Sequence, residues 1–166
     1  TINRTTFLST VSGITVSDGG QLQLAENQNT AVSDYNLAEG AVLKLNGNDT
    51  NAIGAPPLAP VGALNFGVIA TGRTMTFHNP VELQSDATIS VQAYVPVSGT
   101  QYGVPGTQGV LDNIVSGPGS LTKYGDGKLT ITNPGSGWGG DTRILTAPTD
   151  ASAPKGAGLS VLCLSN

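Results

Sequence analysis

The sequence predicts an all-β fold, a parallel β-solenoid in which Pro- and Gly-rich loops interrupt short strands. Three observations predict it: apolar and polar residues alternate over short segments, glycine-containing turns separate these segments, and matching leucines recur at a near-constant interval. No window has the three-to-four spacing of apolar residues that a helix needs without Gly, Pro or β-branched runs. At this length, one domain over residues 1–166 is the expectation.

The expected strands come in units of strand, tight turn and strand. Four segments show this layout: residues 13–24, 37–45, 81–91 and 124–131. In the first unit, Ile14 and Val16 precede the turn Asp18-Gly19-Gly20, and Leu22 and Leu24 follow it. We expect these aliphatic residues to point inward, with the polar residues between them facing outward.

The spacing of the leucines suggests how these units are arranged. Leu22, Leu43, Leu64 and Leu83 follow one another at about 20 residues, which is the interval of solenoid coils that stack around a continuous apolar column. Three segments rich in Pro, Gly or small residues interrupt the pattern, and we expect loops there: residues 49–62, 94–109 and 147–158. Short strands at close spacing also occur in sandwiches, so an antiparallel β-sandwich is the alternative fold.

Charge, cysteine and histidine content exclude several kinds of site. Only 11% of residues are charged and the seven Lys and Arg residues are scattered, so no basic cluster is available to bind nucleic acid. The single cysteine, Cys163, excludes an internal disulfide and a cysteine-rich zinc site, and its apolar neighbours predict burial. His78 is the only histidine, and its surroundings indicate a surface or half-buried structural imidazole at the end of a strand. No segment is apolar over the length that spans a bilayer.

Residues 114–144 carry a recognisable motif, with a glycine-rich opening, Leu-x-Lys-x-Gly-x-Gly, alternating strand residues, an aromatic, Gly-Gly, Thr and an aliphatic residue. The matching positions are Gly117, Gly119, Leu121, Lys123, Gly125, Gly127, Leu129, Ile131, Trp138, Gly139, Gly140, Thr142 and Ile144. This segment resembles the autotransporter-associated β-strand repeat of exported bacterial proteins. Asn133-Pro134 departs from the pattern, since the family usually has Gly and Asn there.

The resemblance implies right-handed parallel β-helical coils in the passenger region of an exported bacterial protein. The expected localisation is therefore extracellular or on the bacterial cell surface, and the expected function is that of a structural or adhesive module, such as part of a secreted adhesin. The resemblance brings no catalytic residues, so we expect no enzymatic activity, no cofactor and no metal. Uncapped solenoid ends expose sheet edges, so self-association through the ends is also expected, with the terminal run at residues 159–164 as its motif.

Four aromatic residues in or beside glycine-rich segments are candidate ligand contacts, because exposed rings can stack on sugars: Trp138, Tyr94, Tyr102 and Tyr124. In the alternative interpretation, Trp138 covers the end of a coil and the tyrosines pack against loops. The ligand-binding interpretation leaves a second function open, a carbohydrate-binding module or a polysaccharide-degrading β-helix enzyme with a glycan or host surface component as partner.

A degrading enzyme would need converging carboxylates, for which Asp86 and Asp126 on adjacent coils are the candidates. The turns at residues 18–20 and 125–127 resemble fragments of calcium-binding repeats, but neither is complete, so they predict turns rather than a metal site. A viral or phage surface protein is a third alternative, because such chains share low charge and many Gly, Ser and Thr residues.

Overall fold

The computed structural model describes residues 9–17, 20–24, 32–46, 64–69, 73–93, 108–125, 127–145 and 160–165. Within these ranges the chain is all-β and contains no helix. The strands are β1 (Ile14–Ser17), β2 (Leu22–Gln23), β3 (Val32–Tyr35), β4 (Leu43–Asn46), β5 (Leu64–Ile69), β6 (Thr74–Phe77), β7 (Val81–Leu83), β8 (Ala87–Ala93), β9 (Gln108–Leu111), β10 (Val115–Ser116), β11 (Leu121–Tyr124), β12 (Lys128–Ile131), β13 (Thr142–Leu145) and β14 (Val161–Leu164). In this part of the chain, no helix is long and apolar enough to cross a membrane.

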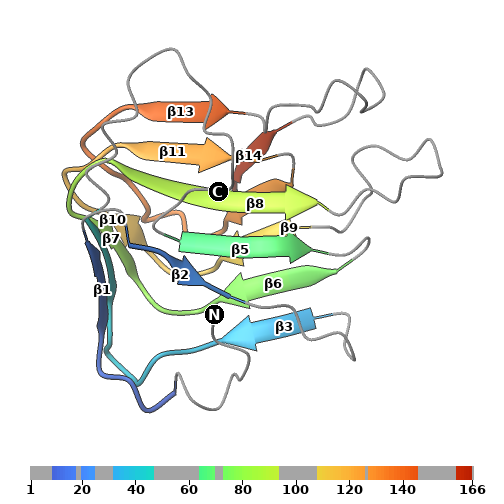
Figure 1. Cartoon of the computed structure of the whole chain (residues 1–166). Coiled ribbons are helices and arrows are strands. Elements are labelled where there is room, and N and C mark those ends of the chain that lie inside the picture. The colour runs from blue at the N-terminus through green and yellow to red at the C-terminus, as the bar shows by residue number, and fades with distance from the viewer. Residues whose placement is uncertain are drawn as a thin grey trace.

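The strands form three parallel sheets. The first sheet has the order β1-β4-β7-β10, the second β2-β5-β8-β11-β13 and the third β3-β6-β9-β12-β14. Figure 1 shows β5, β8, β11 and β13 of the second sheet lying one above another. Because every pairing between described strands is parallel, the antiparallel sandwich is not the fold, and the expectation of parallel all-β structure is confirmed.

The hydrophobic core draws on strands of all three sheets. Leu45 of β4, Leu64 of β5 and Phe77 of β6 all belong to this core and are fully buried. Along β4 and β6 buried residues alternate with partly exposed ones, as the period of two predicts. Burial of each such side chain stabilises the fold by about 1.5–3 kcal/mol, so the inward-facing column supplies the main driving force.

The spacing between successive leucines is not the sequence distance between paired strands of one sheet. Leu22 pairs with Leu64 in the second sheet, whereas Leu45 pairs with Leu83 in the first. The evenly spaced leucines therefore alternate between two sheets, and the expected coil of about 20 residues was wrong here. Connecting segments of unequal length separate paired strands, so the sequence distance between partners varies along the chain.

The expected turns redirect the chain from one sheet to the next. At the end of β11, Gly125 has a φ of 90°, a left-handed conformation that glycine adopts readily, in the turn expected at 125–127; Asp126 lies outside the described residues. Gly20 donates its backbone N–H to the Ser17 carbonyl at 2.9 Å at the corner between β1 and β2. Since the strands on either side of each corner belong to different sheets, these units are corners and not hairpins.

The expected loops at 49–62 and 147–158 lie outside the described residues, as does 94–109 except for its last two residues. Gln108 and Gly109 belong to β9, so that segment ends earlier than predicted. In chain order, 94–107 and 146–159 both connect a strand of the second sheet to a strand of the third. The two segments therefore connect the same two sheets, whereas 49–62 connects the first sheet to the second.

Candidate functional site at the β13–β14 end

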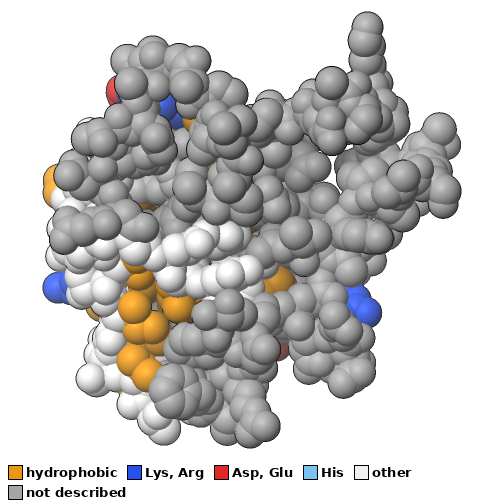
Figure 2. All heavy atoms as spheres, viewed as in Figure 1, with side chains coloured by type: hydrophobic (Ala, Val, Ile, Leu, Met, Phe, Trp, Pro, Cys, Tyr) orange, Lys and Arg blue, Asp and Glu red, His pale blue; other side chains and the backbone are white. Residues whose placement is uncertain are grey.

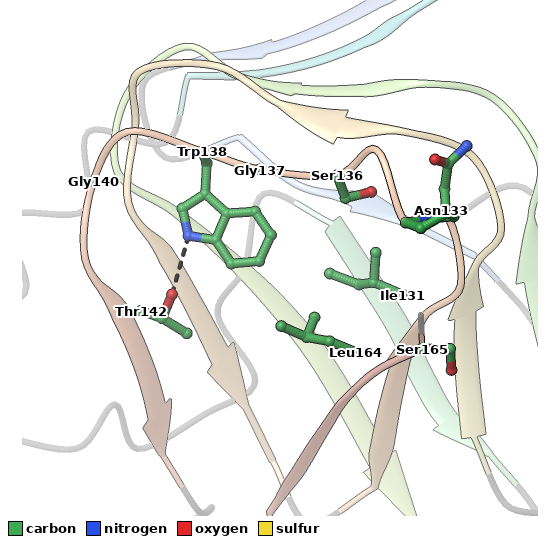
Figure 3. Close-up of a pocket in the computed structure, with 10 residues that line it drawn as sticks. Ile131, Asn133, Ser136, Gly137, Trp138, Gly140, Thr142, Leu164 and Ser165 are labelled. Atoms are coloured by element: carbon green, nitrogen blue, oxygen red, sulfur yellow. Dashed lines mark hydrogen bonds between the residues drawn. The ribbon is translucent and has the colours of Figure 1, made fainter.

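A pocket of about 300 Å³ opens at the end of the molecule formed by β13 and β14. Its walls come from the ends of β12 and β14, from the segment between β12 and β13, and from the start of β13. Ten residues of the described ranges line it, and none of these ten is charged (Figure 3). Its side-chain walls include Ile131, Ser136, Trp138, Thr142, Leu164 and Ser165. We call it the end pocket.

The segment before β13 forms one wall because it runs along β10. The Gly137 N–H donates to the Val115 carbonyl at 2.8 Å, and the Val115 N–H donates to the Ser136 hydroxyl at 3.0 Å. Further along, the Gly139 N–H donates to the Gly117 carbonyl at 2.9 Å. Although the first sheet ends at β10, this segment takes the place of one more strand beside it.

Gly140 allows this close approach. A Cβ at this position would lie 2.5 Å from the Ser120 hydroxyl oxygen and 2.6 Å from the Ser120 nitrogen. A glycine at position 140 of the motif therefore lets two backbones meet close to Trp138.

Trp138 lies both against the core and on the wall of the end pocket. Its indole Nε1–H donates to the Thr142 hydroxyl at 3.0 Å, and the partly buried ring packs against the core. Figure 3 shows the indole on one side of the hollow, with Ile131 and Leu164 on the other. The ring therefore covers the end of the core, as one interpretation expected, and still presents a surface to the pocket.

Of the other three candidate aromatics, the structure describes only Tyr124, which does not line the end pocket. Tyr124 is 1% exposed, so its ring is not available to stack on a sugar. It lies on β11, which is flanked by β8 and β13, and it pairs with Ser90 on one side and Leu145 on the other. Tyr94 and Tyr102 lie outside the described residues.

Cys163 is partly exposed, so the expectation of burial was wrong. The alternation along β14 explains the difference, since Leu162 packs against the core and the next residue faces the opposite side of the strand. Cys163 instead pairs with Thr130 on the outer face of the third sheet.

His78, which follows β6, lies between two carboxylates: Asp34 on β3 and Asp112 directly after β9. Its Nδ1 is 2.5 Å from Asp112 Oδ2 and its Nε2 is 3.2 Å from Asp34 Oδ1. A carboxylate only accepts hydrogen bonds, so the ring satisfies both neighbours when both of its nitrogens carry protons. The histidine side chain is 31% exposed, which confirms the expected half-buried position. These two side-chain contacts join the β3, β6 and β9 levels of the sheet.

Asparagines stand at one corner of three successive levels, a feature that the sequence reasoning missed. Asn79, Asn113 and Asn133 each follow by two positions the aligned strand residues Phe77, Leu111 and Ile131.

The buried Asn79 accepts a hydrogen bond from Leu37 N and donates to the carbonyls of Ala38 and Ala41. The signal in the sequence was an asparagine two residues after the end of β6, β9 and β12.

Lys123, at the lysine position of the repeat-like motif, is fully buried. Its Nζ donates to the Gly125 carbonyl and, at 2.8 Å, to the Ser160 hydroxyl. The side chain therefore ties the corner after β11 to the residue that precedes β14, which is a structural task.

Among the described residues, the ten that line the end pocket offer binding surfaces but no carboxylate, lysine or histidine for proton transfer. Of the carboxylate pair considered for sugar cleavage, Asp86 accepts a hydrogen bond from Ser120 N at 3.2 Å, and Asp126 lies outside the described residues. Within the described ranges, no group of three His, Cys, Asp or Glu residues could hold a metal ion. In Figure 2 the Lys and Arg side chains on the visible face are far apart.

No family model, curated protein or solved structure matches the chain.

Proposed function

We propose that the chain is a right-handed parallel β-helix that serves as a non-catalytic structural or adhesive module of an exported bacterial protein. The strand order carries this proposal. Up to β12 the chain visits the first, second and third sheets in that order, and each strand pairs in parallel with the strand three places earlier. A chain that does so winds around a common axis, and right-handed connections between parallel strands are strongly favoured.

The repeat-like segment fits one winding of this helix. Residues 114–144 contain β10, β11 and β12 and reach into β13, so the motif covers one strand of each sheet before the second sheet is met again. Its leucines point into the core, where Leu121 and Leu129 are fully buried. The motif therefore contains the same set of strands as one winding of the chain. This agreement supports the proposed link to exported bacterial proteins, for which the expected localisation is extracellular or at the cell surface.

The placement of the long connections supports a display role. Residues 94–107 and 146–159 both leave the second sheet and enter the third. At the next corner, by contrast, the chain passes from the third sheet to the first within a few residues, as at Asp112–Ile114. A stack in which two of the three long connections join the same pair of sheets is suited to presenting recognition loops together.

Epitope insertion tests this arrangement. A short epitope between Ser98 and Gly99 should leave the far-UV spectrum and the melting temperature of the purified chain nearly unchanged, because the cost of lengthening a connection grows slowly. The same epitope between Asp112 and Asn113 should prevent folding. Equal tolerance of both insertions would contradict the winding.

Localisation is tested in the bacterium that produces the chain. Antibody labelling and protease treatment of intact cells should reach the protein, and fractionation should find it outside the cytoplasm. Recovery in the cytoplasmic fraction alone would reject the export proposal while leaving the fold intact.

Self-association through the ends stays a prediction. The two ends differ, since Val16 and Leu22 in the first winding are buried, whereas Ile144 and Leu164 in the last are 49% and 60% exposed. Any association would therefore involve the β13–β14 end, and sedimentation at increasing protein concentration measures it.

A second candidate function, a carbohydrate-binding module, is favoured by the end pocket with its tryptophan wall.

A further inference from the structure

We propose that the end pocket is a binding site for one neutral pyranose ring, which stacks against the indole of Trp138. This inference goes beyond the proposed scaffold role and does not depend on export or display. It rests on the aromatic wall, on the hydroxyl groups around it, on the lack of charge among the described lining residues and on the size of the hollow.

Two contacts hold the indole of Trp138 in place. The Nε1–H···Oγ1 bond to Thr142 fixes the edge of the indole, and the core supports one face. Neighbouring glycines, Gly137 and Gly139, carry no side chains that could cover the ring. A preorganised indole suits a pyranose because the ring presents a flat patch of C–H groups, and little side-chain entropy remains to be lost on binding.

Hydroxyl groups near the ring supply the polar half of the site. Thr142 Oγ1 accepts a hydrogen bond from the indole and Ser136 Oγ accepts one from the Val115 N–H. Each hydroxyl thus keeps its own proton to donate and a second lone pair to accept. Sugar hydroxyls are also both donors and acceptors, so they match this rim in a way that a purely apolar ligand would not.

Charge and size narrow the ligand class. The described lining residues include no cation to pair with a phosphate, sulfate or carboxylate, so they favour a neutral sugar over acidic sugars and nucleotides. A volume of about 300 Å³ is at the small end of ligand pockets, and it suits one ring better than an oligosaccharide. Leu164 is 60% exposed at the rim, so the pocket is open to solvent on that side and a longer glycan could extend outward.

The chain carries its own reporter, because Trp138 is the only tryptophan in the sequence. Purified full chain is titrated with the methyl α- and β-pyranosides of glucose, galactose and mannose while tryptophan emission is recorded. We expect a saturable shift for at least one of them and none for the methyl glucuronide. Absence of any shift, together with absence of saturation-transfer NMR signals from the sugars, would overturn the proposal.

Variants locate the site by NMR titration, which does not need the indole. Trp138→Ala should weaken binding of the responding sugar at least about tenfold, and Trp138→Phe should weaken it less because a stacking ring remains. Leu145→Ala is the control, since Leu145 is an exposed apolar residue of β13 outside the pocket lining. Unchanged binding in Trp138→Ala would overturn the assignment.

Because Trp138 also packs on the core, a second variant guards against loss of folding. Leu164→Ala removes part of the opposite wall at a 60% exposed position, so it should lower affinity several-fold without lowering the melting temperature. An emission change that follows protein concentration but not sugar would mean that a second copy covers the pocket, and this would also reject the sugar site.

Discussion

At the scale of single residues, Gly140 has no room for a side chain, whereas Gly137 on the same segment does. A Cβ on Gly140 would lie 2.5 Å from the Ser120 hydroxyl oxygen, while a Cβ on Gly137 would have nothing within 4 Å. We expect Gly140→Ala to lower the free energy of unfolding by about 1–3 kcal/mol through overpacking.

The matched variant, Gly137→Ala, should be neutral or raise stability by about 0.4–1 kcal/mol through the reduced entropy of the unfolded chain. Urea unfolding measures both changes in the free energy of unfolding, and the slope of that free energy against urea concentration should be the same in all variants. Equal effects of the two alanines would mean that the contact with Ser120 does not limit position 140.

His78 allows a second residue-scale prediction. Its two carboxylate partners are 54% and 37% exposed, so solvent screens the interaction and His78→Gln should cost at most about 1 kcal/mol at low salt. The difference from the unaltered chain should disappear in 1 M salt, where the Debye length is about 3 Å.

Thermal unfolding of both proteins at low and high salt measures this difference. Lys44→Gln is the control, because Lys44 makes one exposed 3.8 Å pair with Glu82 and should change little at either salt concentration. A cost of His78→Gln that persists in high salt would instead indicate packing.

Residue roles divide clearly into those visible in the sequence and those set by distant partners. The corner at Gly125 and the alternating leucines follow from local pattern, and the sequence predicts both. By contrast, Asn79 bonds to Leu37, 42 positions away, and no local signal reveals that contact. Tyr124 is too buried for the ligand contact considered for it, and Cys163 is less buried than expected, because the burial of a strand's outer face depends on other elements.

At the scale of elements, the corner between the third and first sheets depends on one amide side chain. Asn79 is buried and bonds to Leu37 N at 2.6 Å and to the Ala38 and Ala41 carbonyls at 3.2 Å each. Asn79→Ala leaves these buried backbone groups without that partner, so we expect a loss of about 1–3 kcal/mol.

The chain offers a matched control at the same corner of another level. Asn133 Oδ1 accepts only an exposed hydrogen bond from Gly135 N, so Asn133→Ala should cost less than about 1 kcal/mol. Urea unfolding compares the two variants, and faster exchange of the Leu37 amide in Asn79→Ala locates the damage. Similar losses at both positions would argue for a general role of asparagine in the corner turn.

Strand positions were easier to predict than strand partners. Alternation placed β1, β4, β7 and β12 correctly, because the period of two is local. The partner of each strand depends on how many residues lie in between, and those segments vary in length. The leucine interval therefore suggested a repeat that the pairing of Leu22 with Leu64 does not follow, and the end pocket, built from parts of two windings, had no signature except Trp138.

At the scale of the whole molecule, the β13–β14 end of the stack should be less stable than its centre. In stacked repeats each winding is supported only by its neighbours, so a winding with one neighbour opens more easily than a central one. All four residues of β13 are exposed, whereas residues 87–91 of β8 are all buried between neighbouring strands on both sides. The β13–β14 end should therefore open locally.

Hydrogen exchange measures this difference without any substitution. Amides of β13 and β14 should exchange through openings at least about 2 kcal/mol less costly than those of β8, which corresponds to roughly 30-fold faster exchange. Low urea should accelerate exchange in β8 but barely in β14, because a local opening exposes little surface. If a responding pyranoside is found, it should slow exchange at Thr142 and Leu164 first, since only the closed end forms the pocket. Uniform exchange across β8, β13 and β14 would show instead that the stack unfolds as one cooperative unit.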